Sequence, residues 1–159
     1  QFVVSSNFYL PGALSTHSIV LNGAYLLKDK SVEINFSNSF PFSRGYISET
    51  LYRMIKWGVN YHLPLLYPEA GFANIVYLLR VRSDLFYDQT HIKDFFRNGD
   101  IFKIDFRSTG TEIYFDTKWW NELPLTFGIR YSRLLDEDIF GGTGRNRWEF
   151  ILPVNLLNN

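Results

Sequence analysis

The sequence contains no cysteine, one methionine and only three histidines among its 159 residues. Without cysteine there is no disulfide framework and no thiolate metal site. No stretch of about 18 residues is continuously apolar, which excludes a transmembrane helix. Basic and acidic residues balance at 16 each. No charge excess therefore favours nucleic acid as a partner, and no motif indicates a cofactor.

Aromatic residues, in contrast, are abundant at 18% of the chain, and five stretches alternate polar and apolar residues. The clearest stretch is Asn74–Asp88, where the even positions carry four charged residues and the odd positions are almost all apolar. Alternate side chains of a strand lie on opposite faces. This pattern is typical of a strand between a bilayer and water. A search for long apolar runs does not detect such strands, because half of their residues face water.

Eight strands are predicted, and most have the length of about 9–11 residues that a tilted transmembrane strand needs. In the sixth strand the alternation changes phase around Ser108–Gly110, which predicts a β-bulge at the glycine. We expect an all-β, antiparallel transmembrane barrel segment that occupies residues 1–159 and belongs to a longer chain. The expected strands are Phe2–Leu10, His17–Leu27, Ser31–Ser37, Leu51–Leu63, Ala73–Asp88, Phe102–Lys118, Leu125–Leu135 and Arg147–Leu157.

The expected connections differ in length in a regular way. Three are tight: Lys28–Lys30, Leu65–Gly71 and Asn121–Pro124. Three are long: Asn38–Thr50, Gln89–Ile101 and Asp136–Asn146. From the second connection onward the two kinds alternate, as they do in outer-membrane barrels with short periplasmic turns and long external loops.

Two alternatives stay open at this point. In a soluble β-sandwich or a lipocalin-like barrel, the aromatic faces would point into a core. In a membrane, the strands must close into a ring, either alone as eight strands or with further strands. The charged residues expected to face inward are Glu33, Lys56, Arg80, Arg82, Asp84, Asp88, Lys103, Asp105, Arg107, Arg130 and Glu149.

Arg44, Gly45 and Tyr46 lie in the first long connection. A guanidinium inside a barrel needs a carboxylate partner. Asp88 is the first choice for that partner, because it ends its strand on the inward face, and Asp84 or Glu149 is the second choice. Gly45 would allow a turn or a close approach to the wall.

These residues resemble motifs of the bacterial surface antigen barrels, which include the BamA-like outer-membrane insertases and the two-partner-secretion translocators. Arg44-Gly45-Tyr46 is similar to the family's Arg-Gly-aromatic loop motif. Phe86-Tyr87-Asp88 is similar to its Phe-x-Asp-x-Gly wall motif, with Thr90 at the glycine position, and Arg107 to Gly110, including Thr109, resembles the start of the next strand. The resemblance covers nearly the whole chain.

The resemblance implies a sixteen-stranded barrel of which this chain forms the C-terminal half, with the Arg44 loop inside the lumen. It implies protein insertion or translocation at the bacterial outer membrane, or anchoring of a larger envelope assembly. The implied partners are the lipid bilayer, other outer-membrane or periplasmic proteins and the missing part of the barrel. In an insertase, the last strand would form one side of a seam; its residues include Trp148, Phe150, Leu152 and Pro153.

Other functional classes have weaker support. An enzyme needs a nucleophile, a base and an orienting group. Of the three histidines, His17 and His91 are expected at the external ends of strands and His62 near the periplasmic end. No His, Asp or Glu cluster has metal-ligand spacing, and Gly141–Gly144 lacks the Lys-Ser/Thr of a phosphate loop. We therefore expect a non-enzymatic protein; a free-standing small barrel with a structural, pore or ligand-binding role is the alternative.

Overall fold

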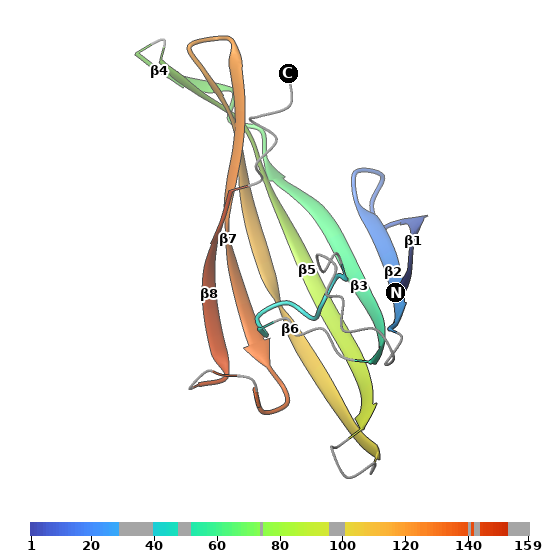
Figure 1. The fold of residues 1–159 in the computed structure, drawn as a ribbon. Helices are drawn as coiled ribbons and strands as arrows, with labels where there is room; N and C mark the ends of the chain where they lie inside the picture. The colour runs from blue at the N-terminus through green and yellow to red at the C-terminus, as the bar shows by residue number, and fades with distance from the viewer. Residues whose placement is uncertain are drawn as a thin grey trace.

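The computed structural model describes residues 1–28, 40–47, 52–73, 75–95, 101–139, 141 and 144–152, apart from the side chains of 94, 95, 101 and 102. These residues form one antiparallel sheet of eight strands (Figure 1). The all-β prediction is therefore confirmed. The strands are β1 (Phe2–Pro11), β2 (Ser18–Leu27), β3 (Arg53–Leu66), β4 (Ala70–Phe72), β5 (Val76–Phe95), β6 (Ile101–Trp119), β7 (Leu123–Leu134) and β8 (Asn146–Ile151).

The sheet order follows the sequence, β1-β2-β3-β5-β6-β7-β8, and the short β4 pairs with β5 outside this path. The expected strand Ser31–Ser37 lies outside the described residues. It does not separate β2 from β3 in the sheet, because Leu27 pairs directly with Arg53. The expected tight turn Lys28–Lys30 lies outside the described residues apart from Lys28, and residues 28–52 separate β2 from β3 in the sequence.

Connections of different length lie at the two ends of the sheet. Residues 12–17, 67–75 and 120–122 connect strands at one end, here called the turn end. Residues 28–52, 96–100 and 135–145 connect them at the other, the loop end. The expected long loop Gln89–Ile101 is much shorter, because β5 continues to Phe95 and pairs with β6 throughout. The β5–β6 hairpin projects beyond its neighbours at the loop end, which is the lower end in Figure 1.

The two faces of the sheet have different chemistry. The face covered by residues 40–47 is called the inward face, and the opposite one the outward face. Outward side chains include many exposed large apolar residues, with Trp148 72% and Phe150 69% exposed. Inward side chains near the middle of the sheet are polar or charged and mostly buried, among them Asp84, Asp88 and Glu112.

The only break in the β5–β6 register lies between Leu78 and Arg80, so the bulge is at Leu79 in β5. Gly110, where the bulge was expected, pairs in register with Phe86 and with Ser132. The bulge shifts the alternation of β5: Leu78 pairs with the outward Thr117, whereas Arg80 pairs with the inward Asp116. Residues 76 and 78 thus join the outward face, contrary to the uninterrupted alternation expected from the sequence.

A small apolar core lies on the inward face at the loop end. Strand residues from β2, β3, β5, β6 and β7 pack there against the 40–47 segment. The cluster consists of Ala24, Leu26, Phe40, Tyr46, Met54, Ile92, Phe106 and Leu134. Within the described part of the chain, no helix is long and apolar enough to cross a bilayer.

Candidate functional site: the docked Arg-Gly-Tyr segment

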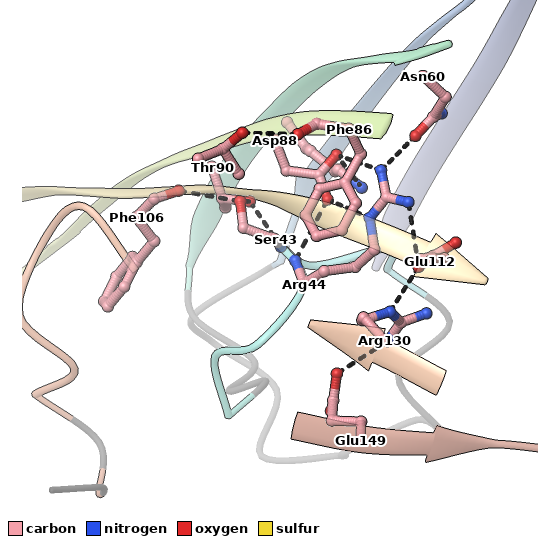
Figure 2. A network of polar contacts seen from close by, with 12 residues as sticks. Ser43, Arg44, Asn60, Phe86, Asp88, Thr90, Phe106, Glu112, Arg130 and Glu149 are labelled. Carbon is pink, nitrogen blue, oxygen red and sulfur yellow. Dashed lines mark hydrogen bonds and ion pairs between the residues drawn. The ribbon is translucent and has the colours of Figure 1, made fainter. Parts of the chain in front are cut away.

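Residues 40–47 lie across the inward face of β5, β6 and β7 near the loop end (Figures 1 and 2). Phe40 is buried in the apolar cluster, and Phe42 packs against its edge. The rings of Phe42 and Phe106 are 5.4 Å apart. Aromatic burial therefore fixes the segment on one side of Arg44, and the polar contacts described below fix Arg44 itself.

Arg44 makes a two-point contact with Asp88, the partner expected from the sequence. Its Nε donates to Asp88 Oδ2 at 2.7 Å, and its second terminal nitrogen donates to Asp88 Oδ1 at 3.2 Å. The backbone N–H of Arg44 also donates to Asp88 Oδ2, at 3.2 Å. The same guanidinium donates to Asn60 Oδ1 in β3 and lies 3.2 Å from Glu112 Oε1 in β6. These four contacts of one guanidinium join β3, β5 and β6.

The Arg44–Asp88 pair belongs to a larger charged network (Figure 2). Lys56 Nζ lies 3.3 Å from Asp88 Oδ1, so this fully buried carboxylate has two cationic partners. Glu112 accepts from Arg130 Nε, and Arg130 lies 3.1 Å from Glu149. The network therefore contains three cations (Arg44, Lys56, Arg130) and three carboxylates (Asp88, Glu112, Glu149) and is neutral as a whole. Such balance lets buried charges persist without uncompensated desolvation.

Thr90, two residues after Asp88 in β5, binds the segment directly. Ser43 N–H donates to Thr90 Oγ1 at 3.1 Å, and the two hydroxyls are 2.7 Å apart. The Ser43 hydroxyl also donates to the Phe106 carbonyl at 2.9 Å. Ser43 and Thr90 are both buried. The threonine therefore provides a hydrogen-bond partner for the segment that a glycine could not provide.

Gly45 and Tyr46 complete the docking against β6 and β7. Gly45 has φ +85°, and a Cβ there would lie 2.7 Å from Ser132 Cβ. Both the left-handed backbone and the close approach therefore require glycine. The Tyr46 hydroxyl donates to the Arg107 carbonyl at 2.8 Å, and its ring meets Phe106 edge-on at 5.0 Å. Burial raises the pKa of the Tyr46 phenol, which therefore stays protonated as a donor at neutral pH.

Phe86 in β5 and Gly110 in β6 pair in the sheet directly beneath the Arg44 guanidinium. The Arg44 guanidinium carbon lies 3.7 Å from the centre of the Phe86 ring, a cation–π contact. The Phe86 ring in turn lies over Gly110, where an added Cβ would be 2.9 Å from the ring and 1.9 Å from the Tyr131 carbonyl. Thr109 Oγ1 donates to the Phe86 carbonyl at 2.9 Å. Gly110 therefore makes room for Phe86 and does not form a bulge.

Several charged residues expected at the site lie elsewhere. Asp84 is inward but pairs with His62, with 2.5 Å between Oδ1 and Nδ1, while Glu149 reaches Arg44 only through Arg130 and Glu112. Arg107 lies on the outward face, because it pairs in register with Gln89 and not with Asp88. Its guanidinium binds Asp136 at 2.7 Å.

Lys103 and Asp105 share that outward face with Arg107, so the inward placement expected for all three is wrong. The alternation changes around Ser108–Gly110 because the inward residues before it, Ile104 and Phe106, are apolar and pack in the core at the loop end. Glu33 lies outside the described residues. Trp148 and Phe150 are outward and exposed in β8, and Leu152 follows it, also exposed; Pro153 is outside the described residues.

The histidines lie in separate places. His17 Nδ1 is 2.6 Å from the Tyr61 hydroxyl at the turn end, and His91 Nδ1 is 2.5 Å from Asp105 Oδ1 at the loop end. The expectation that both lie at the external ends is wrong, since direct β2–β3 pairing puts the β1–β2 connection at the turn end. Among the residues that the structure describes, no three His, Asp or Glu side chains gather as a metal site.

Sequence reasoning missed three contributors to the site: Ser43, Asn60 and Glu112. Glu112 could have been identified from the register, because it pairs with the inward Asp84 and therefore lies on the same face as Asp88. The arrangement as a whole contains no exposed nucleophile or open acid–base pair. Its ion pairs and hydrogen bonds hold a connecting segment against the inward face of the sheet. No family model, curated protein or solved structure matches this chain.

Proposed function

We propose that this chain forms part of the wall of a transmembrane β-barrel in the bacterial outer membrane, with the Arg44 segment inside its lumen. In this proposal the complete barrel belongs to the surface antigen type that includes the BamA-like insertases. Its role is non-enzymatic: it inserts or translocates proteins, or anchors an envelope assembly. The observation that carries the proposal is the division of one sheet into an apolar outward face and a charged inward face to which the segment is docked.

The outward face supports a lipid neighbour over a second protein layer. Its exposed aromatic and aliphatic side chains extend over the long strands from β1 to β8. One row across this face consists of Tyr61 in β3, Leu85 in β5, Thr111 in β6, Tyr131 in β7 and Trp148 in β8. In a soluble sandwich such a surface would be covered, because contiguous exposed apolar patches rarely exceed a few hundred Å². Within the described ranges, one sheet is present and nothing covers this face.

The sheet edges support a ring that is completed by further strands. β1 and β8 are the two ends of the strand order, and in the described residues they do not pair with each other. Unpaired backbone groups cannot face hydrocarbon, so a sheet in a membrane must close. In our proposal, the rest of a longer chain supplies the strands between β8 and β1.

The proposed activity depends on β8 and on the docked segment. In the closed ring, β8 pairs with a strand of the missing part, and weak pairing at this seam would let its edge open and bind an incoming strand of a client protein. Arg44, Ser43 and Tyr46 bind β3, β5 and β6, and in this proposal they keep the wall behind this edge in one shape. The docked segment also narrows the inward space, which disfavours the passive-pore alternative.

The membrane part of the proposal can be tested with single cysteines, since the natural chain has none. Leu85→Cys and Ile129→Cys replace exposed outward residues, and Asn22→Cys replaces a half-buried inward residue beside a cavity. In native outer membranes, we expect a water-soluble maleimide to label Asn22→Cys but not the two outward cysteines until the protein is denatured. Rapid labelling of the outward cysteines in intact membranes would contradict a lipid-facing surface.

The insertion or translocation part is tested by Arg44→Met in the native protein. We expect the variant to lower the amount of folded outer-membrane proteins, measured by heat-modifiable electrophoresis, or the amount of client protein secreted into the medium. Arg80→Gln, which changes an exposed inward arginine at the turn end, is the matched control. An Arg44→Met protein that is present at normal level and leaves every client unchanged would contradict the proposed role.

A further inference from the structure

Three basic side chains lie side by side on the outward face at the loop end. Arg53 in β3 pairs with Lys93 in β5, and Lys93 pairs with Lys103 in β6. Directly opposed residues of an antiparallel pair have Cβ atoms about 4.5–5.5 Å apart, and like charges in such positions destabilise the sheet. A row of three cations therefore needs a source of negative charge.

The described protein supplies little of that charge. Among the described residues, no carboxylate pairs with Arg53, Lys93 or Lys103. Asp105, the nearest acid in the adjoining row, is held by His91 at 2.5 Å. Arg53 lies over the Tyr25 ring at 5.5 Å, and its Nε is buried with no hydrogen-bond partner in the described structure. A buried donor without an acceptor is costly, so the described protein leaves Arg53 incompletely compensated.

A cleft of about 210 Å³ joins these groups and is lined by Arg53, Ile55, His91, Lys93 and Lys103. Its charges are two lysines and an arginine against the single nearby Asp105. Phosphate oxygens suit this set, because arginine and lysine are the common binders of phosphate groups.

The apolar surface begins directly next to the cleft. Ile55 lies in its lining, and Trp57, two residues further along β3, is 48% exposed on the same outward face. Tyr87 packs against Trp57 with 5.4 Å between ring centres. A soluble anion would leave this surface uncovered. A lipid would satisfy both parts, with its phosphate in the cleft and its acyl chains along Ile55 and Trp57.

We infer that Arg53, Lys93 and Lys103 bind the phosphate-bearing headgroup of a membrane lipid at the loop end of the barrel. This inference rests on the membrane location in the proposed function and adds a lipid preference to it. The cations mark the level at which the apolar outward face gives way to headgroups.

The test measures quenching of tryptophan fluorescence by brominated lipids in the native protein reconstituted into vesicles. The vesicles contain phosphatidylcholine, and in parallel samples either brominated phosphatidic acid or brominated phosphatidylcholine. Trp57 lies next to the cleft, and its signal is the difference between the protein and a Trp57→Phe variant, because the chain has four tryptophans. We expect the wild-type protein to bind phosphatidic acid in preference to phosphatidylcholine.

Two charge-matched variants locate that preference. Lys93→Gln with Lys103→Gln should lower the binding ratio by about fivefold for each lysine removed. Arg133→Gln with Arg145→Gln removes two exposed cations outside the row and should leave the ratio unchanged. An equal fall in both double variants would overturn the inference, because it would indicate diffuse attraction.

Two further outcomes separate the inference from the proposed function. Equal quenching by both lipids would overturn the lipid site while leaving the outward face in the bilayer. Loss of the preference in millimolar inorganic phosphate would also overturn it, in favour of a soluble anion. No quenching by either brominated lipid would instead contradict the membrane location itself, and the inference with it.

Discussion

The two ends of the inward face use the same kinds of ion pair in different surroundings. On the loop-end side, beneath the docked segment and extending to the middle of the sheet, Asp88 and Glu112 have side chains that are 0% and 4% exposed, and Arg44 is 16% exposed. At the turn end, Arg80 and Arg82 bind Asp116, but the two arginines are 46% and 34% exposed. The docked segment covers the first set, and no described segment covers the second.

This difference indicates how much each pair contributes to stability. Charges near water are screened and contribute little, whereas removing one member of a buried pair leaves the other without compensation. We therefore expect substitutions at the loop end to be far more destabilising than equivalent ones at the turn end. The predictions below test that contrast in the native protein, by urea unfolding in detergent micelles followed by tryptophan fluorescence.

Asp88→Asn should have the largest effect, because it removes the carboxylate shared by Arg44 and Lys56. We expect a loss of about 3–5 kcal/mol in the free energy of unfolding. Asp116→Asn is the matched change at the turn end and should cost much less. Equal losses in the two variants would show that burial by the segment does not govern the energy of these pairs.

Gly45→Ala should destabilise the docked segment by about 2–4 kcal/mol, from left-handed strain and from overlap with Ser132. Gly144 also has a positive φ, but a Cβ there meets no atom within 4 Å. Gly144→Ala therefore isolates the strain component and should cost less. If both variants lose the same stability, the close approach to Ser132 contributes nothing.

Ser43→Ala should cost about 1–3 kcal/mol, because the buried Thr90 hydroxyl and Phe106 carbonyl lose a partner. Combining it with Thr90→Val should cost less than the sum of the two single changes. A double-mutant cycle measures this coupling. Strict additivity would contradict a direct energetic link between the two hydroxyls.

Arg80→Gln at the turn end should cost less than about 1 kcal/mol, and the cost should shrink further in high salt. The measurement is the urea midpoint at two salt concentrations. A loss comparable to that of Asp88→Asn would remove the distinction between the ends.

The smallest expected effect is a pH dependence in the 135–145 connection. The Arg107 guanidinium holds the pKa of Asp136 below its ordinary value. A carboxyl with a depressed folded-state pKa contributes stability above its unfolded pKa of about 3.9, and that contribution disappears as pH falls through the folded value. Asp136→Asn should therefore flatten the acid limb of the wild-type stability curve. An unchanged acid limb would show that the ion pair does not contribute.

Much of the wall could be predicted from alternation, because each long strand has one face against apolar surroundings and one against polar ones. Arg44 and Asp88 could also be placed together, since a buried guanidinium requires a carboxylate. Asp88 was expected on the inward face, at the end of its strand next to the long connections. The same reasoning failed where one face changes character along its length. Phe106 and Ile104 are inward and apolar, so Lys103, Asp105 and Arg107 were assigned to the wrong face.

Strand boundaries and pairings were less predictable. Gln89 to Lys93 looked like a loop because the segment is polar, yet β5 continues through it with Thr90 and Ile92 buried. The pairing of β2 with β3 depends on hydrogen bonds between distant segments, which composition does not encode. Glu112 and Asn60 come from strands whose registers are set by such pairing, so their contacts with Arg44 required the structure.

The order in which the chain is made gives the docked segment a further property. Arg44 precedes its partner Asp88 by 44 residues, and Tyr46 precedes Asp136 by 90. The full set of contacts needs β5, β6 and the start of the 135–145 connection in place, and closing such long loops costs chain entropy. Docking of the segment therefore joins parts of the chain that are made far apart in time.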